Sequence, residues 1–304
     1  EESILESLDF RRAMRKVDEE YGADDWWFQV WGPDELDEEG IDNPQNWVLK
    51  RTDAEGVQRS DGEDSWHAFG DMARGFNMLD PIKATIITPG LDIDGKFGET
   101  GIPASIVTKY LAEHGVVVEK TGLYSFFIMF TIGITKGRWN SLLTELQQFK
   151  DDYDRNQPMW RCMPEFCEKQ PLYEKMGLRD LCQHVHTLYA KYDVAILSTE
   201  MYLSDHTPEM TPTAAFSCIA ARTTQRVPID DLEGRITTSL VTPYPPGIPL
   251  LIPGEVFNRK IVEYLKFNRA FARECPGFET DIHGLVQEED AQGQIQYFAD
   301  CVAV

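Results

Sequence analysis

Residues 83–131, KATIITPGLDIDGKFGETGIPASIVTKYLAEHGVVVEKTGLYSFFIMFT, carry the pattern that decides the fold of this chain. The run at 83–88 is rich in β-branched residues, which predicts a strand that closes at Pro89. A polar, glycine-containing turn region follows it. Pro103 suits the first position of a helix, where its missing N–H is not needed. That helix is expected to run to about His114.

The second half of this stretch predicts a pair of strands and another helix. Three valines at 116–118 indicate a strand after Gly115 has capped the helix, and 120–122 indicate a turn. A second strand is predicted at 123–131, because that run is apolar enough to lie inside a sheet. A helix follows Gly137, with apolar residues at helical spacing at Trp139, Leu142, Leu143, Leu146 and Phe149. The order β-α-β-β-α predicts a small sheet with helices packed on it.

The segment before this stretch also alternates between helix and strand signals. Apolar side chains up to Val17 fall roughly on one helical face, and Gly22 is expected to end that helix. The aromatic run at 26–31 has strand composition. The fold class is therefore predicted to be α/β, or α+β over the whole chain.

A domain boundary is predicted near residue 156, where charge, proline and a loss of periodicity coincide. Beyond it, the pattern predicts helices at 178–192 and 258–273 and a last strand at 294–302. The proline-rich stretch 243–254 alternates proline with apolar residues that favour burial. It is therefore interpreted as an ordered segment wedged between domains rather than a polyproline linker.

Composition excludes several classes of function. The 304 residues include 29 basic and 51 acidic side chains, which gives a formal net charge of −22. A nucleic-acid-binding protein needs a basic face, so this charge argues against that function. The same charge disfavours binding to an anionic membrane surface. No apolar run reaches the roughly 18 residues of a membrane span. The six cysteines form no C-x-x-C pair, and no secretory leader is evident, so reduced thiols and a cytoplasmic location are expected.

Few residues carry a chemical signal on their own. His184 and His186 would diverge on a helix, so no metal site is predicted. His67, beside Trp66, is interpreted either as a structural histidine or as a base in an aromatic cleft. Glu119 ends an apolar run, and it is either a charge at a hairpin edge or a carboxylate that awaits a cationic ligand. Neither a phosphate-binding glycine loop nor a G-x-S-x-G motif is present.

Several longer motifs together resemble one family. The chain is similar to the C-terminal half of the bacterial, pyridoxal-phosphate-dependent decarboxylases of ornithine, lysine and arginine, which have an aspartate-aminotransferase-like fold. This resemblance implies a small aminotransferase-like domain at 1–156 and a decarboxylase C-terminal domain at 157–304. The motifs that carry it are Ser65-Trp66-His67, LDPIK at 79–83, TPG at 88–90, GIPASIV at 101–107, HGVVVEKTG at 114–122, TPYPPGIPLLIPGE at 242–255 and PGFETDIHG at 276–284.

The resemblance also implies a cofactor that this chain is not expected to bind alone. The family holds pyridoxal 5′-phosphate through a lysine in a Ser-x-His-Lys motif, and no His-Lys dipeptide occurs here. No catalytic residue is therefore assigned in this chain, and the Schiff-base lysine is expected in a domain upstream of it. The fragment alone is expected to be inactive.

The same resemblance assigns substrate recognition to Glu119, which would face the distal amine of the substrate, with Lys120, Trp66 and His67 as further candidates. The VEKTG form resembles lysine-specific members, whereas GITKGRW at 133–139 resembles the arginine type. The leading expectation is that the complete enzyme decarboxylates lysine to cadaverine and CO₂. This reaction consumes a proton, and the resemblance implies a role in the response to acid stress. Arginine or ornithine as substrate, and a non-catalytic assembly module, are the alternatives. A homo-oligomer, as dimers and larger rings, is expected.

Overall fold

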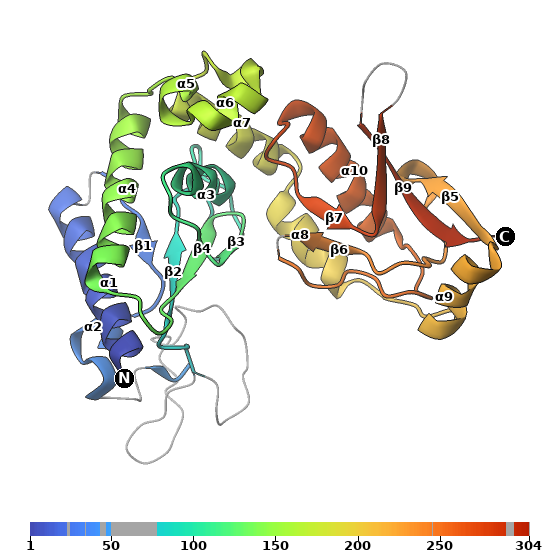
Figure 1. The fold of residues 1–304 in the computed structure, drawn as a ribbon, viewed down its shortest axis with the longest axis horizontal. Helices are drawn as coiled ribbons and strands as arrows, with labels where there is room; N and C mark the ends of the chain where they lie inside the picture. The colour runs from blue at the N-terminus through green and yellow to red at the C-terminus, as the bar shows by residue number, and fades with distance from the viewer. Residues whose placement is uncertain are drawn as a thin grey trace. The chain divides into compact units, whose positions relative to one another are not determined.

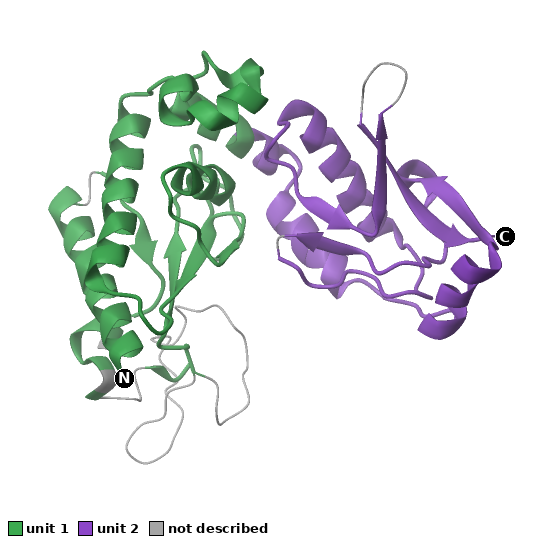
Figure 2. Ribbon diagram, viewed as in Figure 1, with its two compact units in different colours: residues 1–186 green, residues 187–304 purple. Residues whose placement is uncertain are grey.

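A computed structural model describes residues 1–22, 25–33, 35–42, 47–49, 78–244, 246–289 and 295–303. The chain divides into two compact units, Glu1–His186 and Thr187–Val304, which Figure 2 colours separately. The division falls within helix α7 (Leu178–Lys191). The mixed α/β class predicted from the sequence is confirmed in both units.

Unit 1 is built on an antiparallel sheet in the order β1-β2-β4-β3. Its central strands pair from Lys83↔Met129 to Ile87↔Ser125. Figure 1 places α3 beside β3 and β4, and α1 beside α4. The strands are β1 (Gln29–Val30), β2 (Lys83–Ile87), β3 (Lys120–Thr121) and β4 (Ser125–Met129), and the helices include α1 (Glu2–Tyr21), α2 (Glu35–Glu38), α3 (Ala104–Glu113), α4 (Lys136–Asp154), α5 (Met159–Cys162) and α6 (Pro164–Lys169).

One aromatic core joins these helices to the sheet. The ring of Phe10 on α1 lies 5.6 Å from that of Phe130, just after β4. Phe149 of α4 lies 5.8 Å from Phe28 and meets Tyr110 of α3 edge-on at 5.2 Å. All five rings are buried, so α1, α3 and α4 share a single core with the sheet.

The predicted valine strand at 116–118 is wrong. Those residues are irregular, and pairing begins only where the Glu119 N–H donates to the Phe127 carbonyl at 3.0 Å. Gly115 has φ +83°, and the Val116 N–H returns to the Leu111 carbonyl at 2.8 Å. The valines therefore complete the C-terminal turn of α3, and β3 lies where a turn was predicted.

Other predicted elements needed smaller corrections. The strand predicted at 83–88 is confirmed as β2, and Pro103 is the N-cap of α3 rather than its first helical residue. The strand predicted at 26–31 is confined to Gln29 and Val30. These two residues pair with Ile87 and Ile86 of β2 at the edge of the sheet, and the Trp31 N–H donates to the Thr85 carbonyl at 2.8 Å.

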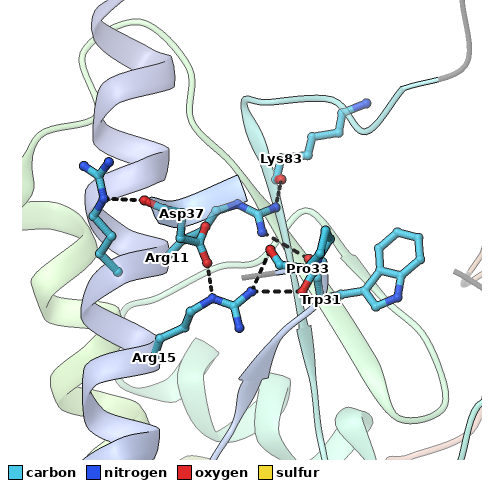
Figure 3. Close-up of polar contacts among 8 residues, drawn as sticks. Arg11, Arg15, Trp31, Pro33, Asp37 and Lys83 are labelled. Atoms are coloured by element: carbon cyan, nitrogen blue, oxygen red, sulfur yellow. Dashed lines mark hydrogen bonds and ion pairs between the residues drawn. The ribbon is translucent and has the colours of Figure 1, made fainter. Parts of the chain in front are cut away.

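Three arginines of α1 tie the helix to the segment that follows β1 and to the start of β2 (Figure 3). Arg11 is fully buried, and its guanidinium donates to the Trp31 carbonyl at 3.0 Å and the Lys83 carbonyl at 2.9 Å. Burial lowers the pKa of Arg11 to about 10. Arg15 forms an ion pair with the buried Asp37, whose backbone carbonyl accepts from Arg12 at 2.7 Å.

A buried lysine makes a second tie, between α4 and the end of α1. Lys150 Nζ lies 2.8 Å from both Asp25 Oδ1 and Asp154 Oδ2. It also lies 4.5 Å from the ring centroid of Trp26 and 5.0 Å from that of Tyr21. Burial opposes the charge, yet the hydrogen bonds to the two carboxylates leave the pKa of Lys150 raised.

Unit 2 has a three-stranded sheet in the order β5-β9-β8 and a separate β6-β7 pair. Helix α10 buries one apolar face, and its N-cap, Asn258, accepts from the Ile261 N–H at 3.0 Å. The strands are β5 (Thr224–Pro228), β6 (Thr242–Tyr244), β7 (Asp281–His283), β8 (Leu285–Glu289) and β9 (Ile295–Val302), and the helices are α8 (Val194–Leu203), α9 (Pro212–Ala221) and α10 (Arg259–Glu274).

The described part of the proline-rich stretch is ordered, as predicted, and its contacts with Val241 and Tyr202 lie within unit 2. Leu250 and Leu251 are both buried, and Leu251 bridges to Val241. The helices predicted at 178–192 and 258–273 and the last strand are also confirmed.

The boundary predicted at residue 156 falls at the end of α4, inside unit 1. The Asn156 side chain accepts from the Arg179 N–H at 3.0 Å and donates to Asp180 at 2.9 Å. These contacts hold the start of α7 to the end of α4. A domain division at 156 therefore stays a prediction that differs from the division into compact units. In the described residues, no helix is long and apolar enough to cross a membrane.

Candidate functional site

Unit 1 contains a hollow of about 610 Å³ that we call the Glu119 hollow. It lies where the end of α3, the end of β4 and the first turns of α4 meet. Its walls are formed by Gly115, Val116, Val117, Val118, Glu119, Ile128, Met129, Phe130, Thr131, Ile134, Arg138, Trp139, Ser141 and Leu142. The valines predicted to form a strand therefore form one wall of this hollow.

Glu119 owes its place to the start of the β3–β4 pairing. Its backbone N–H donates to Phe127, which fixes the residue at the rim, and its side chain is exposed. Lys120 is the next residue of an extended strand, so its side chain leaves the opposite face. Only Glu119 of this pair lines the hollow, and a role for Lys120 in substrate binding stays a prediction.

The walls around Glu119 are largely apolar. Val116, Val118, Ile128 and Ile134 are only partly buried, so their side chains remain available to a ligand. Such a surface removes methylene groups from water without offering them a polar partner. The hollow can therefore hold an aliphatic chain that ends in a charge at Glu119.

The indole of Trp139 forms a fixed part of this wall. Its Nε1–H donates to Glu6 Oε2 on α1 at 2.6 Å, and the side chain is 5% exposed. Its ring also packs edge-on against Phe10 at 6.0 Å. Because two contacts from α1 hold the ring, this wall is preformed.

Arg138 is the lining residue that sequence reasoning missed. It lies in the first turn of α4, is exposed, and is the only positively charged residue among the described ones that line the hollow. In the described part of the chain, it forms no ion pair with Glu119. The sequence did contain a signal for it. Arg138, Ser141 and Leu142 have the i, i+3, i+4 spacing that places residues on one face of a helix.

Among the histidines considered in the sequence, His186 does not line this hollow. Trp66 and His67 lie outside the described residues. His186 is buried and engaged: its Nδ1 lies 2.6 Å from the Tyr124 hydroxyl and its Nε2 lies 2.9 Å from the Gly98 carbonyl oxygen. It therefore packs the loop before α3 against α7.

A second hollow, of about 510 Å³, is lined by acidic and aromatic residues that include Asp25, Trp26 and Trp27. Asp25 is already paired with Lys150, and Trp26 stacks over the same ammonium. A protein cation thus occupies the position that a ligand cation would take. The Glu119 hollow, whose carboxylate has no such partner where the structure is described, is the stronger candidate.

Comparison with protein families gives two matches. The major domain of the Orn/Lys/Arg decarboxylases matches residues 1–138. The C-terminal domain of the same family matches residues 195–303. The predicted division at 156 falls between these two ranges.

Individual relatives are similar over nearly the whole chain. Lysine decarboxylase LdcA of Pseudomonas aeruginosa is 42% identical over 308 residues, which cover 99% of this chain and 39% of LdcA. The inducible lysine decarboxylase of Escherichia coli is 38% identical over 95% of the chain and 39% of its own length. The biodegradative arginine decarboxylase of Escherichia coli is 35% identical over 93% of the chain and 39% of its own length. The chain thus spans 39% of each of these relatives.

Solved structures agree with these relatives. Lysine decarboxylase A from Pseudomonas aeruginosa superimposes with a TM-score of 0.89 at 42% identity, over 99% of this chain and 39% of that one. The constitutive lysine decarboxylase of Escherichia coli gives a TM-score of 0.84 at 33% identity, over 99% of this chain and 40% of that one.

Proposed function

The chain belongs to the Orn/Lys/Arg decarboxylase family, and we propose on this premise that it is part of a lysine decarboxylase and binds the side chain of the substrate at Glu119. One observation carries the proposal. Glu119 offers an exposed carboxylate at the rim of an apolar hollow, with no protein cation paired to it in the described residues. That arrangement matches an aliphatic chain that ends in an ammonium group.

The chemistry of a basic amino acid fits this arrangement in two parts. The apolar wall formed by Val118 and Ile134 would cover the methylene groups, and Glu119 would accept hydrogen bonds from the terminal ammonium. Once the rest of the enzyme excludes water, such a contact is worth about ten- to a hundredfold in discrimination. Lysine is preferred to arginine and ornithine because LdcA is 42% identical to this chain, against 35% for the arginine enzyme.

The decarboxylation itself needs pyridoxal phosphate, which supplies an electron sink when it is bound. The residues of this chain do not fit that cofactor at the three hollows that contain Asp25, Glu119 and Arg15, because no described lysine lines any of the three. Lys150, which is fully buried, is held by Asp25 and Asp154. The imine-forming lysine is therefore proposed to lie in a part of the enzyme outside this sequence, which makes the chain alone inactive.

Assembly with other subunits is the second proposed role. Helix α9 is apolar along its length, yet Ala215 is its buried residue and Phe216 is 64% exposed. An apolar helix with so little of its surface covered is typical of a contact between subunits. A homo-oligomer is proposed on this basis, and sedimentation of a Phe216→Ser variant tests it.

The substrate proposal is tested in the complete enzyme that contains this chain. Glu119→Gln should raise the KM for lysine about ten- to a hundredfold and weaken the preference for lysine over ornithine, because the amide cannot form a charge-assisted contact. Glu168→Gln, at an exposed position on α6, is the matched control and should leave both quantities unchanged. An unaltered KM and preference in the Glu119 variant would rule the proposal out.

A further inference from the structure

The Glu119 hollow carries two opposite charges on its walls. Glu119 lies immediately before β3, and Arg138 lies in the first turn of α4. Both side chains are exposed, and they form no ion pair with each other in the described residues. Two opposite charges that line one hollow without neutralising each other match a ligand that carries both signs at separate positions.

The substrate and the product of a basic amino-acid decarboxylase differ in this respect. The amino acid carries a carboxylate and a distal ammonium group. The diamine that forms after loss of CO₂ carries two ammonium groups and no carboxylate. Glu119 attracts the distal ammonium of both molecules, so it cannot discriminate between them. A positive charge in the same hollow attracts the carboxylate of the amino acid and repels the second ammonium of the diamine.

The neighbouring cation of α4 does not take part in this arrangement. Lys136 Nζ lies 5.9 Å from the Trp139 ring centroid, and Lys136 does not line the hollow. Arg138 is therefore the positive group that a ligand in the hollow would meet. A guanidinium also suits a carboxylate, because its N–H groups can donate two parallel hydrogen bonds.

We infer, resting on the proposed function, that Arg138 is a specificity-determining residue that favours the amino acid over its diamine product in the Glu119 hollow. Such discrimination limits inhibition by accumulated product. It also explains why a side chain that repels cations lines a hollow proposed to bind one.

The test uses the complete enzyme, with lysine as substrate and 1,5-diaminopentane as competitive inhibitor. Arg138→Gln should raise the KM for lysine and lower the Ki of the diamine. The ratio of Ki to KM should fall about fivefold, the size expected of one solvent-exposed charge interaction. Arg138→Lys should restore most of the ratio, and Lys136→Gln should not change it. High salt should reduce the difference between wild type and Arg138→Gln.

The opposite movement of KM and Ki separates this role from structural damage, which would raise both. An unchanged ratio in Arg138→Gln, beside a raised KM in Glu119→Gln, overturns the inference and leaves the proposed function standing. A changed ratio beside an unaltered Glu119→Gln enzyme keeps the role of Arg138 but contradicts that of Glu119. If neither variant changes either constant, both ideas fail. Titration calorimetry with the diamine provides a readout that is independent of turnover.

Discussion

The two units solve the problem of buried polar groups differently. Unit 1 buries Arg11, Asp37 and Lys150 and gives each of them polar contacts with distant segments, although Arg11 Nε and Asp37 Oδ1 have no hydrogen-bond partner among the described residues. In the described part of unit 2, the buried polar side chains are uncharged, namely Thr237, Thr238 and Asn268. In the described part of unit 2, each ion pair of a lysine or arginine has at least one exposed member, as in Asp230, which lies 2.6 Å from Arg269 and is 51% exposed.

This difference makes the two units vulnerable to different changes. A buried ion is tolerated only while its partner is present, so unit 1 should fail when one member of a pair is removed. Surface pairs contribute little, so unit 2 should tolerate the same kind of change. All seven tryptophans lie in unit 1, so tryptophan fluorescence follows the unfolding of that unit alone.

The largest effect is expected from Asp37→Asn. The change leaves the guanidinium of Arg15 without its carboxylate and removes the nearby negative charge that favours the buried charge of Arg11. Unit 1 should lose about 3–5 kcal/mol in free energy of unfolding. Urea titration followed by tryptophan fluorescence measures the loss. A midpoint within error of the wild type would contradict the account of unit 1.

A smaller effect is expected from Lys150→Met. The methionine fills much of the same volume, and the abandoned Asp25 and Asp154 side chains are each 45% exposed and can be hydrated. The loss at neutral pH should be about 1–3 kcal/mol. It is measured by the same titration.

The pH dependence of the Lys150 contribution has a definite sign. The folded pKa of Lys150 is raised above its ordinary value of 10.5, so its contribution is fully present below that pH. It is lost as the pH rises through the higher folded value. Wild type should therefore lose stability above about pH 10.5, and Lys150→Met should lose less over that range. If the free energies of unfolding of the two proteins fell in parallel with rising pH, the Lys150 ammonium would not be the source of the pH dependence.

The smallest effect is expected from Asp230→Asn in unit 2. The hydrogen bond from Arg269 lowers the pKa of Asp230, so the pair stabilises the folded state above pH 3.8 and loses that contribution as the pH falls through the folded value. Because Asp230 is 51% exposed, the loss at pH 7 should be below about 1 kcal/mol. Hydrogen exchange read by mass spectrometry in peptides of unit 2 measures it. A loss as large as that of Asp37→Asn would erase the contrast between the units.

Local patterns in the sequence predicted the regular elements well. Helix α10 and strand β2 were found because their periodicity and their end signals agree. The valines at 116–118 led to a wrong strand prediction, because the turn that ends α3 at Gly115 overrides their strand propensity. Propensity is only a weak guide where a helix cap competes for the same backbone groups.

The site was only half predictable. Glu119 stood out because a charge ends an apolar run, whereas Arg138 belongs to a helix that meets Glu119 only in the folded unit. The buried charges were invisible for the same reason. Lys150 contacts Asp25 across 125 positions, and Arg11 contacts Lys83 across 72. No pattern within a single element records such a pair.

The burial of Lys150 also gives the folded protein a chemical signature. An amine-directed acylating reagent reaches exposed lysines but not an ammonium enclosed by two carboxylates and two aromatic rings. Modification of this one lysine would therefore report each opening of unit 1, even when unit 2 stays closed. Mass spectrometry of the labelled peptides over time would therefore measure the rate of local unfolding of unit 1.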